Sequence, residues 1–149
     1  MIQEQQTEIL LVDDDGGNSE LVRRNLQRTG IRNPVVILTN GAEALDYVFR
    51  EGRYASRAPS HLMILLDINM PGEVDGVEVL RRIKSDPLRQ RIPIVMLTTS
   101  DDPREVERCY ALGCNAYMTK PVEPMAFIEA VNRLGLFITV LTVPAEAAK

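Results

Sequence analysis

Five consecutive apolar residues, Leu62–Leu66, lead directly into a carboxylate, Asp67, and then into a turn that contains Pro71. An uninterrupted apolar run of this length is typical of a strand buried on both faces, and helices on both sides of a parallel sheet produce that burial. Ligands of open parallel sheets bind at the carboxyl ends of the strands. The run therefore predicts that Asp67 lies at the mouth of a crevice, and an aspartate that only caps a turn is the alternative.

The composition limits the class of protein. The chain has 149 residues, of which 45% are hydrophobic and 26% charged, so it has room for one domain with a core but not for two. A net charge of -4 offers no basic surface, and we expect no nucleic-acid partner. No apolar run approaches the roughly 20 residues of a membrane span, so we expect a cytoplasmic protein without a membrane segment. Cys109 and Cys114 lack the spacing of a zinc site and are expected to be free thiols.

Strand-like runs alternate with amphipathic helical patterns along the chain. The predicted strands cover residues 9–12, 34–38, 62–66, 92–97 and 116–118. The predicted helices start at Asn18 or Ser19, at Asn40, after Gly76, at Asp102 and near Phe127, and they end at Gly30, Gly52, Ser85, Gly113 and Gly135, respectively. Five strand–helix units with short connections predict an α/β fold, in which one parallel five-stranded sheet is covered on both faces.

The segment 53–61 has no periodicity, and we predict a surface loop without an assigned role. His61 is the one histidine of the chain. We expect it to be an exposed loop residue that does not relay phosphoryl groups, because it has no acidic neighbour.

Polar residues follow the predicted strands at their carboxyl ends, namely Asp13, Asp14, Asp67, Thr98 and Lys120. These ends share one edge of a parallel sheet, so the side chains are expected to converge. Three neighbouring carboxylates repel one another, and oxygen ligands favour Mg²⁺ or Mn²⁺ as the cation that relieves the repulsion. A carboxylate beside such a cation can attack phosphorus, while Lys120 neutralises charge and Thr98 donates a hydrogen bond.

The chain resembles the receiver domain of two-component response regulators. The residues that carry the resemblance are Leu11–Asp14, Leu65–Pro71 with Asp75-Gly76, Leu97–Ser100 and Tyr117–Pro121. The resemblance implies a single receiver domain over residues 1–149, with a core at about 8–134 and a C-terminal extension at 135–149. It also implies a flavodoxin-like (βα)₅ doubly wound sheet with strand order 2-1-3-4-5.

The resemblance further implies the role of each site residue. Asp67 would be the phosphoacceptor, and Asp14 and Asp67 would bind Mg²⁺ together with the backbone carbonyl of Asn69. Asp13 would contribute through a water molecule. By the same resemblance, Thr98 and Lys120 would contact the acyl phosphate, Tyr117 would be the rotameric switch, and the Lys120–Pro121 bond would be cis. The chain would then be a signalling receiver, not an enzyme with an external substrate, and would catalyse phosphotransfer and dephosphorylation only at its own aspartate.

Within the family, the segment 53–61 and the Thr98–Asp102 run look most like the small single-domain regulators that pair with cyanobacterial phytochromes. The resemblance thus implies a sensor histidine kinase as partner, here a phytochrome. Two departures stand out. Gly16-Gly17 replaces a usual proline and is expected to loosen the loop after the acidic residues. The turn from Pro71 to Gly76 is one residue longer than usual and is expected to change the dephosphorylation rate.

Three other functions compete with this interpretation. A haloacid-dehalogenase-type phosphatase would need a second acid at position 69, where this chain has asparagine. A flavodoxin-like FMN carrier would need a phosphate-binding loop where Asp13, Asp14 and Asp15 stand. A receiver-like interaction module that takes no phosphate remains open as the main alternative.

The last stretch of interest is Gly135–Val143, in which six of nine residues are large and apolar. So much exposed apolar surface invites aggregation, so the stretch must be covered. It could pack on its own chain. We instead predict a homodimer that uses the fourth and fifth helices, the fifth strand and this C-terminal tail.

Overall fold

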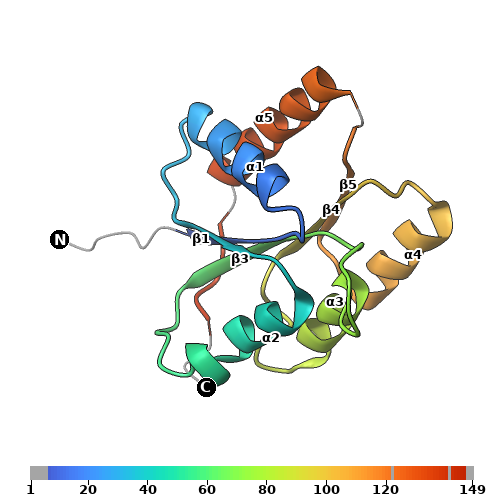
Figure 1. Cartoon of the computed structure of the whole chain (residues 1–149). Helices are drawn as coiled ribbons and strands as arrows, with labels where there is room; N and C mark the ends of the chain where they lie inside the picture. Colours follow the sequence, from blue (N-terminus) through green and yellow to red (C-terminus); the bar gives the residue numbers. More distant parts are fainter. Residues whose placement is uncertain (1–6, 122, 141, 147–149) are drawn as a thin grey trace.

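The structure is a computed structural model that describes residues 7–121, 123–140 and 142–146. One parallel sheet has the strand order β2-β1-β3-β4-β5, and helices cover both of its faces (Figure 1). The strands are β1 (Thr7–Val12), β2 (Val35–Leu38), β3 (His61–Leu66), β4 (Ile94–Thr98) and β5 (Ala116–Thr119). The helices are α1 (Gly16–Arg28), α2 (Gly41–Phe49), the short 3-10 helix η1 (Gly52–Tyr54), α3 (Gly76–Ser85), α4 (Pro103–Leu112) and α5 (Pro124–Val140). The predicted flavodoxin-like fold and strand order are confirmed.

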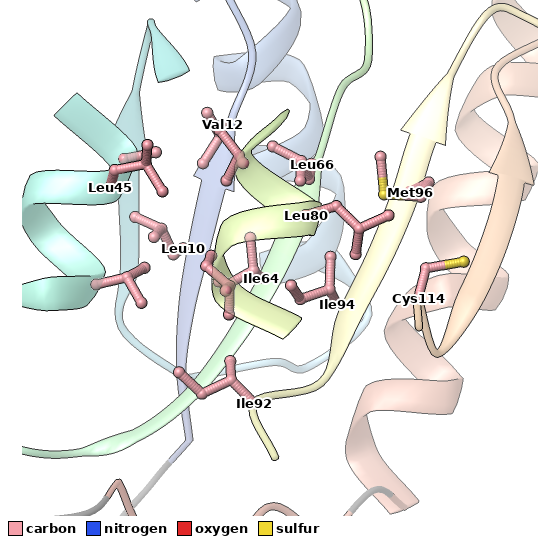
Figure 2. Close-up of a cluster of buried hydrophobic side chains, with 14 of the residues drawn as sticks. Leu10, Val12, Leu45, Ile64, Leu66, Leu80, Ile92, Ile94, Met96 and Cys114 are labelled. Carbon is pink, nitrogen blue, oxygen red and sulfur yellow. The ribbon is translucent and has the colours of Figure 1, made fainter. Parts of the chain in front are cut away.

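Each face of the sheet carries its own apolar cluster, because successive side chains of a strand point to opposite faces. Leu10 belongs to the cluster beneath α2, α3 and α4, whereas its neighbour Ile9 belongs to the cluster beneath α1 and α5. In Figure 2, Leu45 of α2 and Leu80 of α3 lie against side chains of β1, β3 and β4. Leu80 is fully buried, and truncation of such a residue to alanine costs roughly 2–5 kcal/mol of stability.

The helix boundaries follow the capping residues in most places. The Asn40 side chain accepts the Glu43 backbone N–H at 2.7 Å, and Asp102 caps α4, as predicted. Gly113 ends α4 with a left-handed φ of 108°, which glycine adopts without strain. The predicted end of α2 at Gly52 is wrong, because Arg50 already adopts a left-handed φ of 55° and closes the helix.

The predicted start of α1 is also wrong. The N-cap is Asp15, whose side chain accepts the backbone N–H of Asn18, and neither Asn18 nor Ser19 caps the helix. Because Asp15 occupies the cap, Gly16 and Gly17 lie in the first turn of α1. They therefore do not form the loosened loop that two adjacent glycines predict.

Helix α5 runs through Gly135 to Val140 and does not stop at the glycine. A Cβ atom at Gly135 would clash with the hydroxyl group of Thr29. Thr29 is the C-cap residue of α1, which lies on the same side of the sheet as α5. The missing side chain of Gly135 therefore allows α1 and α5 to approach closely. Gly135 does not adopt the left-handed backbone conformation that would end the helix. No helix formed by the described residues has both the length and the apolar character that a membrane span requires.

Beyond α5, residues 142–146 return to the body of the same chain. Ile138 and Val143 are buried, at 6% and 5% exposure, with Ile138 in the cluster beneath α1 and α5. Glu146 forms an ion pair with Arg57 of the loop before β3. The covered core thus extends past the boundary at Leu134, although residues 141 and 147–149 of the predicted extension lie outside the described part of the chain.

His61 is not an exposed loop residue, as the sequence predicts, but the half-buried first residue of β3. Its Nδ1 lies 2.8 Å from the Val143 carbonyl oxygen, and His61 forms an antiparallel bridge with Ala145. The prediction fails because the covering segment comes from the far end of the chain. The segment 53–61, to which no role was assigned, binds the C-terminal segment through Arg57, Ser60 and His61.

Candidate functional site

Polar side chains gather where the strands end, at one edge of the sheet. Asp13 and Asp67 each follow the last residue of a paired strand, β1 or β3, and Lys120 follows the last residue of β5. All strands are parallel, so these positions emerge at the same edge. The local cause is the same in each case, because an apolar run forces a buried strand and the first polar residue after it marks the edge.

Lys120 connects the two buried carboxylates. Its Nζ donates to Asp13 Oδ2 at 2.6 Å and to Asp67 Oδ2 at 3.3 Å. Asp13, Asp67 and Lys120 are 3%, 8% and 6% exposed, so the pairs are shielded from water. Buried ion pairs of this kind must be matched closely, because desolvation of each charge is costly.

Asp14 completes an acidic cluster with Asp13 and Asp67. One carboxylate oxygen from each lies within 4.8 Å of the others, and Asp14 is exposed whereas the other two are buried. Within the described residues, one lysine offsets the charge of three carboxylates at this site. An all-oxygen donor set with one open side fits Mg²⁺ or Mn²⁺, which keep several water ligands.

The protonation of Asp67 reflects its surroundings. Burial raises the pKa of Asp67, and the negative charge of Asp13 raises it further. The charge of Lys120 opposes this rise, as does the backbone N–H of Asn69, which donates to Asp67 Oδ1 at 3.3 Å. Asn69 itself is exposed beside the acceptor carboxylate.

Thr98 ends β4 beside this cluster. It is fully buried, and its hydroxyl oxygen has no hydrogen-bond partner among the described residues. An unpaired buried hydroxyl is costly, so Thr98 is ready to donate to a group that enters the site. Its carbonyl oxygen accepts the backbone N–H of Lys120 at 2.5 Å. The expected cis bond before Pro121 is wrong, because the described residues contain no cis peptide bond, in line with the general preference of proline for trans.

Tyr117 of β5 lies next to the same loop. It is half-buried and packs against the cluster beneath α2, α3 and α4, and its hydroxyl donates to the Ser100 carbonyl oxygen at 2.6 Å. Burial raises the pKa of Tyr117. The ring is therefore held at both ends, by apolar contact and by one hydrogen bond.

Sequence reasoning missed the residues that position the carboxylates. Asn18 Nδ2 donates to Asp13 Oδ2 at 3.3 Å, and the backbone N–H of Asp15 donates to Asp13 Oδ1 at 2.9 Å. Gly76 lies so close to the Asp67 carbonyl oxygen that a Cβ atom there would clash with it. Of these, Asn18 could have been found from its position five residues after Asp13, at the start of a helix.

A comparison with known protein families and structures gives a consistent result. The family model described as the response regulator receiver domain matches residues 9–132. The response regulator Rcp1 of Synechocystis sp. is 37% identical over 138 residues, which is 92% of this chain and 92% of that protein.

Two solved structures extend the comparison. The phosphorylated cyanobacterial phytochrome response regulator RcpA superposes with a TM-score of 0.85 at 35% identity, covering 93% of this chain and 99% of its own. The Mn²⁺-bound form of Rcp1 gives a TM-score of 0.85 at 35% identity, covering 92% of this chain and 98% of its own. The sheet order, the edge occupied by Asp67 and these matches lead to one conclusion: the chain belongs to the response regulator receiver domain family.

Proposed function

We propose that this chain is a phosphorylation-dependent signalling receiver in which Asp67 accepts a phosphoryl group from a sensor histidine kinase in the presence of Mg²⁺ or Mn²⁺. The observation that carries the proposal is the buried contact of Lys120 with Asp13 and Asp67, beside the exposed carboxylate of Asp14. The similarity of the chain to phosphorylated RcpA and to the Mn²⁺-bound form of Rcp1 supports it.

Each residue has a chemical task in this proposal. A carboxylate oxygen of Asp67 forms a bond to phosphorus while the bond from phosphorus to the kinase histidine nitrogen breaks. Lys120 holds positive charge at the transferred oxygens, and the unpaired Thr98 hydroxyl donates to one of them. Asp14 and Asp67, the Asn69 carbonyl and, through water, Asp13 would hold the cation, which neutralises charge on the phosphoryl group. Hydrolysis of the acyl phosphate returns the Asp67 carboxylate.

The partner in this proposal is a phytochrome-type sensor kinase, because RcpA, which is similar to nearly the whole chain, is a cyanobacterial phytochrome response regulator. The proposal includes a cytoplasmic location and no nucleic-acid partner. The test is phosphotransfer from a labelled phytochrome kinase to the wild type and to Asp67→Asn. We expect Mg²⁺-dependent label on the wild type alone. Binding to the kinase without label on either protein would favour the alternative, a receiver-like interaction module that takes no phosphate.

The readout is proposed to run from Thr98 to Tyr117. When the Thr98 hydroxyl turns toward a phosphoryl oxygen, the space beside Tyr117 changes, and α4, β5 and α5 respond together. Tyr117→Ala should therefore keep the labelling of Asp67 but weaken the binding of any phosphorylation-dependent partner. Loss of labelling in this variant would contradict that division of roles.

We also propose a homodimer through α4, β5, α5 and the C-terminal tail. An apolar groove of about 270 Å³ runs between β5 and the second half of α5, and Phe137 lines it. Leu136 and Phe137 are 63% and 45% exposed, although Val143 further along the tail is covered by its own chain. A stable interface needs roughly 800 Å² from each partner, so the proposed interface includes α4 and β5 in addition to the groove beside α5.

Light scattering at tens of micromolar tests the dimer. Leu136→Asp should lower the measured mass to that of a monomer, because Leu136 is exposed and its replacement leaves the buried residues of α5 in place. Leu88→Asp is the matched control, because Leu88 is 45% exposed on the loop after α3. A monomeric wild type, both free and with a phosphoryl mimic, would rule the dimer out.

A further inference from the structure

The loop between β4 and α4 contains a side-chain link that leads to Tyr117. The Ser100 hydroxyl donates to a carboxylate oxygen of Glu105 at 2.7 Å and accepts the backbone N–H of Asp102 at 3.4 Å. The carbonyl oxygen of the same Ser100 accepts the Tyr117 hydroxyl at 2.6 Å. One residue thus joins the first turn of α4 to the aromatic ring on β5.

This arrangement differs from an ordinary helix start. In a capping box, the side chain three residues after the N-cap returns to the N–H of the cap residue. Glu105 stands at that position relative to Asp102, but it bonds to the Ser100 hydroxyl, and Ser100 bonds to the cap N–H in its place. The carboxylate is therefore used to fix Ser100, which lies two residues before the cap.

We propose that Glu105, through Ser100, holds Tyr117 in its docked position and so sets how readily the switch responds to the site at Asp67. This deepens the proposed function and rests on it. Glu105 is a positioning residue, because it touches neither the carboxylates nor Lys120. A hydrogen bond to a charged carboxylate is stronger than one between neutral groups. When the hydrogen bond between Ser100 and Glu105 is removed, the Ser100 carbonyl is free to move. The Tyr117 hydroxyl then loses its acceptor.

The test uses fluorotyrosine-labelled protein, unphosphorylated, and ¹⁹F NMR. The chain has four tyrosines, and the Tyr117 resonance is assigned with Tyr117→Phe. Tyr110, 49% exposed, gives the position of a solvated ring, and Tyr47, 6% exposed and on α2, reports that the fold is intact. In Glu105→Ala the undocked fraction of Tyr117 should rise on the order of tenfold, moving its resonance toward that of Tyr110.

Control variants separate this role from simple capping of α4. Ser100→Ala should shift Tyr117 as Glu105→Ala does, and the double variant should shift it no further, because both remove one link. Glu105→Gln keeps an acceptor oxygen and should restore the docked resonance. Asp102→Ala removes the cap carboxylate and Glu107→Ala removes a nearby exposed charge, but neither should move Tyr117.

Two results would overturn the proposal. One is an unmoved Tyr117 resonance in both Glu105→Ala and Ser100→Ala while Tyr47 reports a folded protein. The other is a shift in Asp102→Ala as large as that in Glu105→Ala, which would assign the effect to loosening of the helix. Neither result bears on whether Asp67 is phosphorylated, since the measurement uses no phosphodonor.

Discussion

The carboxylate of Glu146 holds the C-terminal segment on the loop before β3, and its removal should destabilise the chain. The two Nη atoms of Arg57 donate to it at 2.8 and 2.9 Å, and the Ser60 backbone N–H donates at 2.7 Å. The side chains of Arg57 and Glu146 are only 11% and 6% exposed. The Arg57 guanidinium also lies 4.4 Å from the centre of the Tyr47 ring. Glu146→Ala therefore leaves a shielded cation without its counter-charge.

The magnitude follows from what Arg57 retains. Removal of one partner from a buried ion pair costs roughly 3–5 kcal/mol when the other charge stays buried. Arg57 keeps its bond to the Tyr47 carbonyl at 3.0 Å and its contact with the Tyr47 ring, so its charge is not left wholly without partners. We therefore expect a loss of about 2 kcal/mol in the free energy of unfolding, and a Tm lowered by roughly 4–8 °C for a chain of this size.

Urea unfolding of the wild type, Glu146→Ala, Arg57→Ala and the double variant measures the loss and the coupling between the two residues. Glu129→Ala is the matched control, because Glu129 is exposed on α5 and has no ion pair within the part of the chain described. A Glu146→Ala protein as stable as this control would refute the reasoning, as would single-variant losses that simply add in the double variant.

The pH dependence gives an independent check on the same pair. Burial opposes ionisation of Glu146, but the hydrogen bonds from Arg57 and Ser60 prevail and lower its pKa below the ordinary 4.5. A carboxyl group with a lowered folded-state pKa adds stability that is fully present above its unfolded pKa and is lost as the pH falls through the folded value. The difference between the wild type and Glu146→Ala should thus be constant near neutral pH and shrink below pH 4.5.

Two further predictions concern the metal site and the helix contact. Asp14→Ala should weaken Mg²⁺ binding by at least about tenfold in a metal titration, because it removes a ligand charge. Without Mg²⁺ the same variant should keep or raise the urea midpoint, because Asp14 is exposed and its removal relieves repulsion among the three carboxylates. Unchanged metal affinity would remove Asp14 from the ligand set. Gly135→Ala should lower the free energy of unfolding by about 1–3 kcal/mol, because the added methyl group clashes with Thr29. Gly16→Ala is the control: there is open space around Gly16, so this change should be neutral or stabilising by up to about 1 kcal/mol. Equal effects of the two changes on thermal unfolding would contradict the close approach of α1 and α5.

The sequence predicts those parts of the fold and site that depend on local patterns. An apolar run that ends in a polar residue marks both a buried strand and the edge of the sheet, so the sequence alone assigns Asp67 and Lys120 to one site. Parallel topology then collects these ends without further information. The acidic cluster is for the same reason predictable from the residues that follow β1 and β3.

The parts that could not be predicted depend on contacts between distant segments. In the sequence, Gly135 predicts the end of a helix. Its actual role, to let α5 lie close to Thr29, depends on a residue that is far away in the chain. Glu146 and Arg57 are separated by 89 positions in the chain, and neither has a local pattern that points to the other. The prediction of the α1 N-cap was wrong for a different reason. Several successive residues there can cap a helix, and their side chains alone do not decide which one does.

The central claim is that Asp67 is the phosphoacceptor and that it needs a divalent cation. Its most direct test is intact mass spectrometry of the full chain after incubation with a small phosphodonor, with and without Mg²⁺, followed by mapping of the modified peptide. We expect a single phosphoryl group, formed only with Mg²⁺, released by hydroxylamine as an acyl phosphate is, and mapped to the peptide that contains Asp67. Phosphorylation at another residue, or none when titration shows that Mg²⁺ is bound, would contradict the claim.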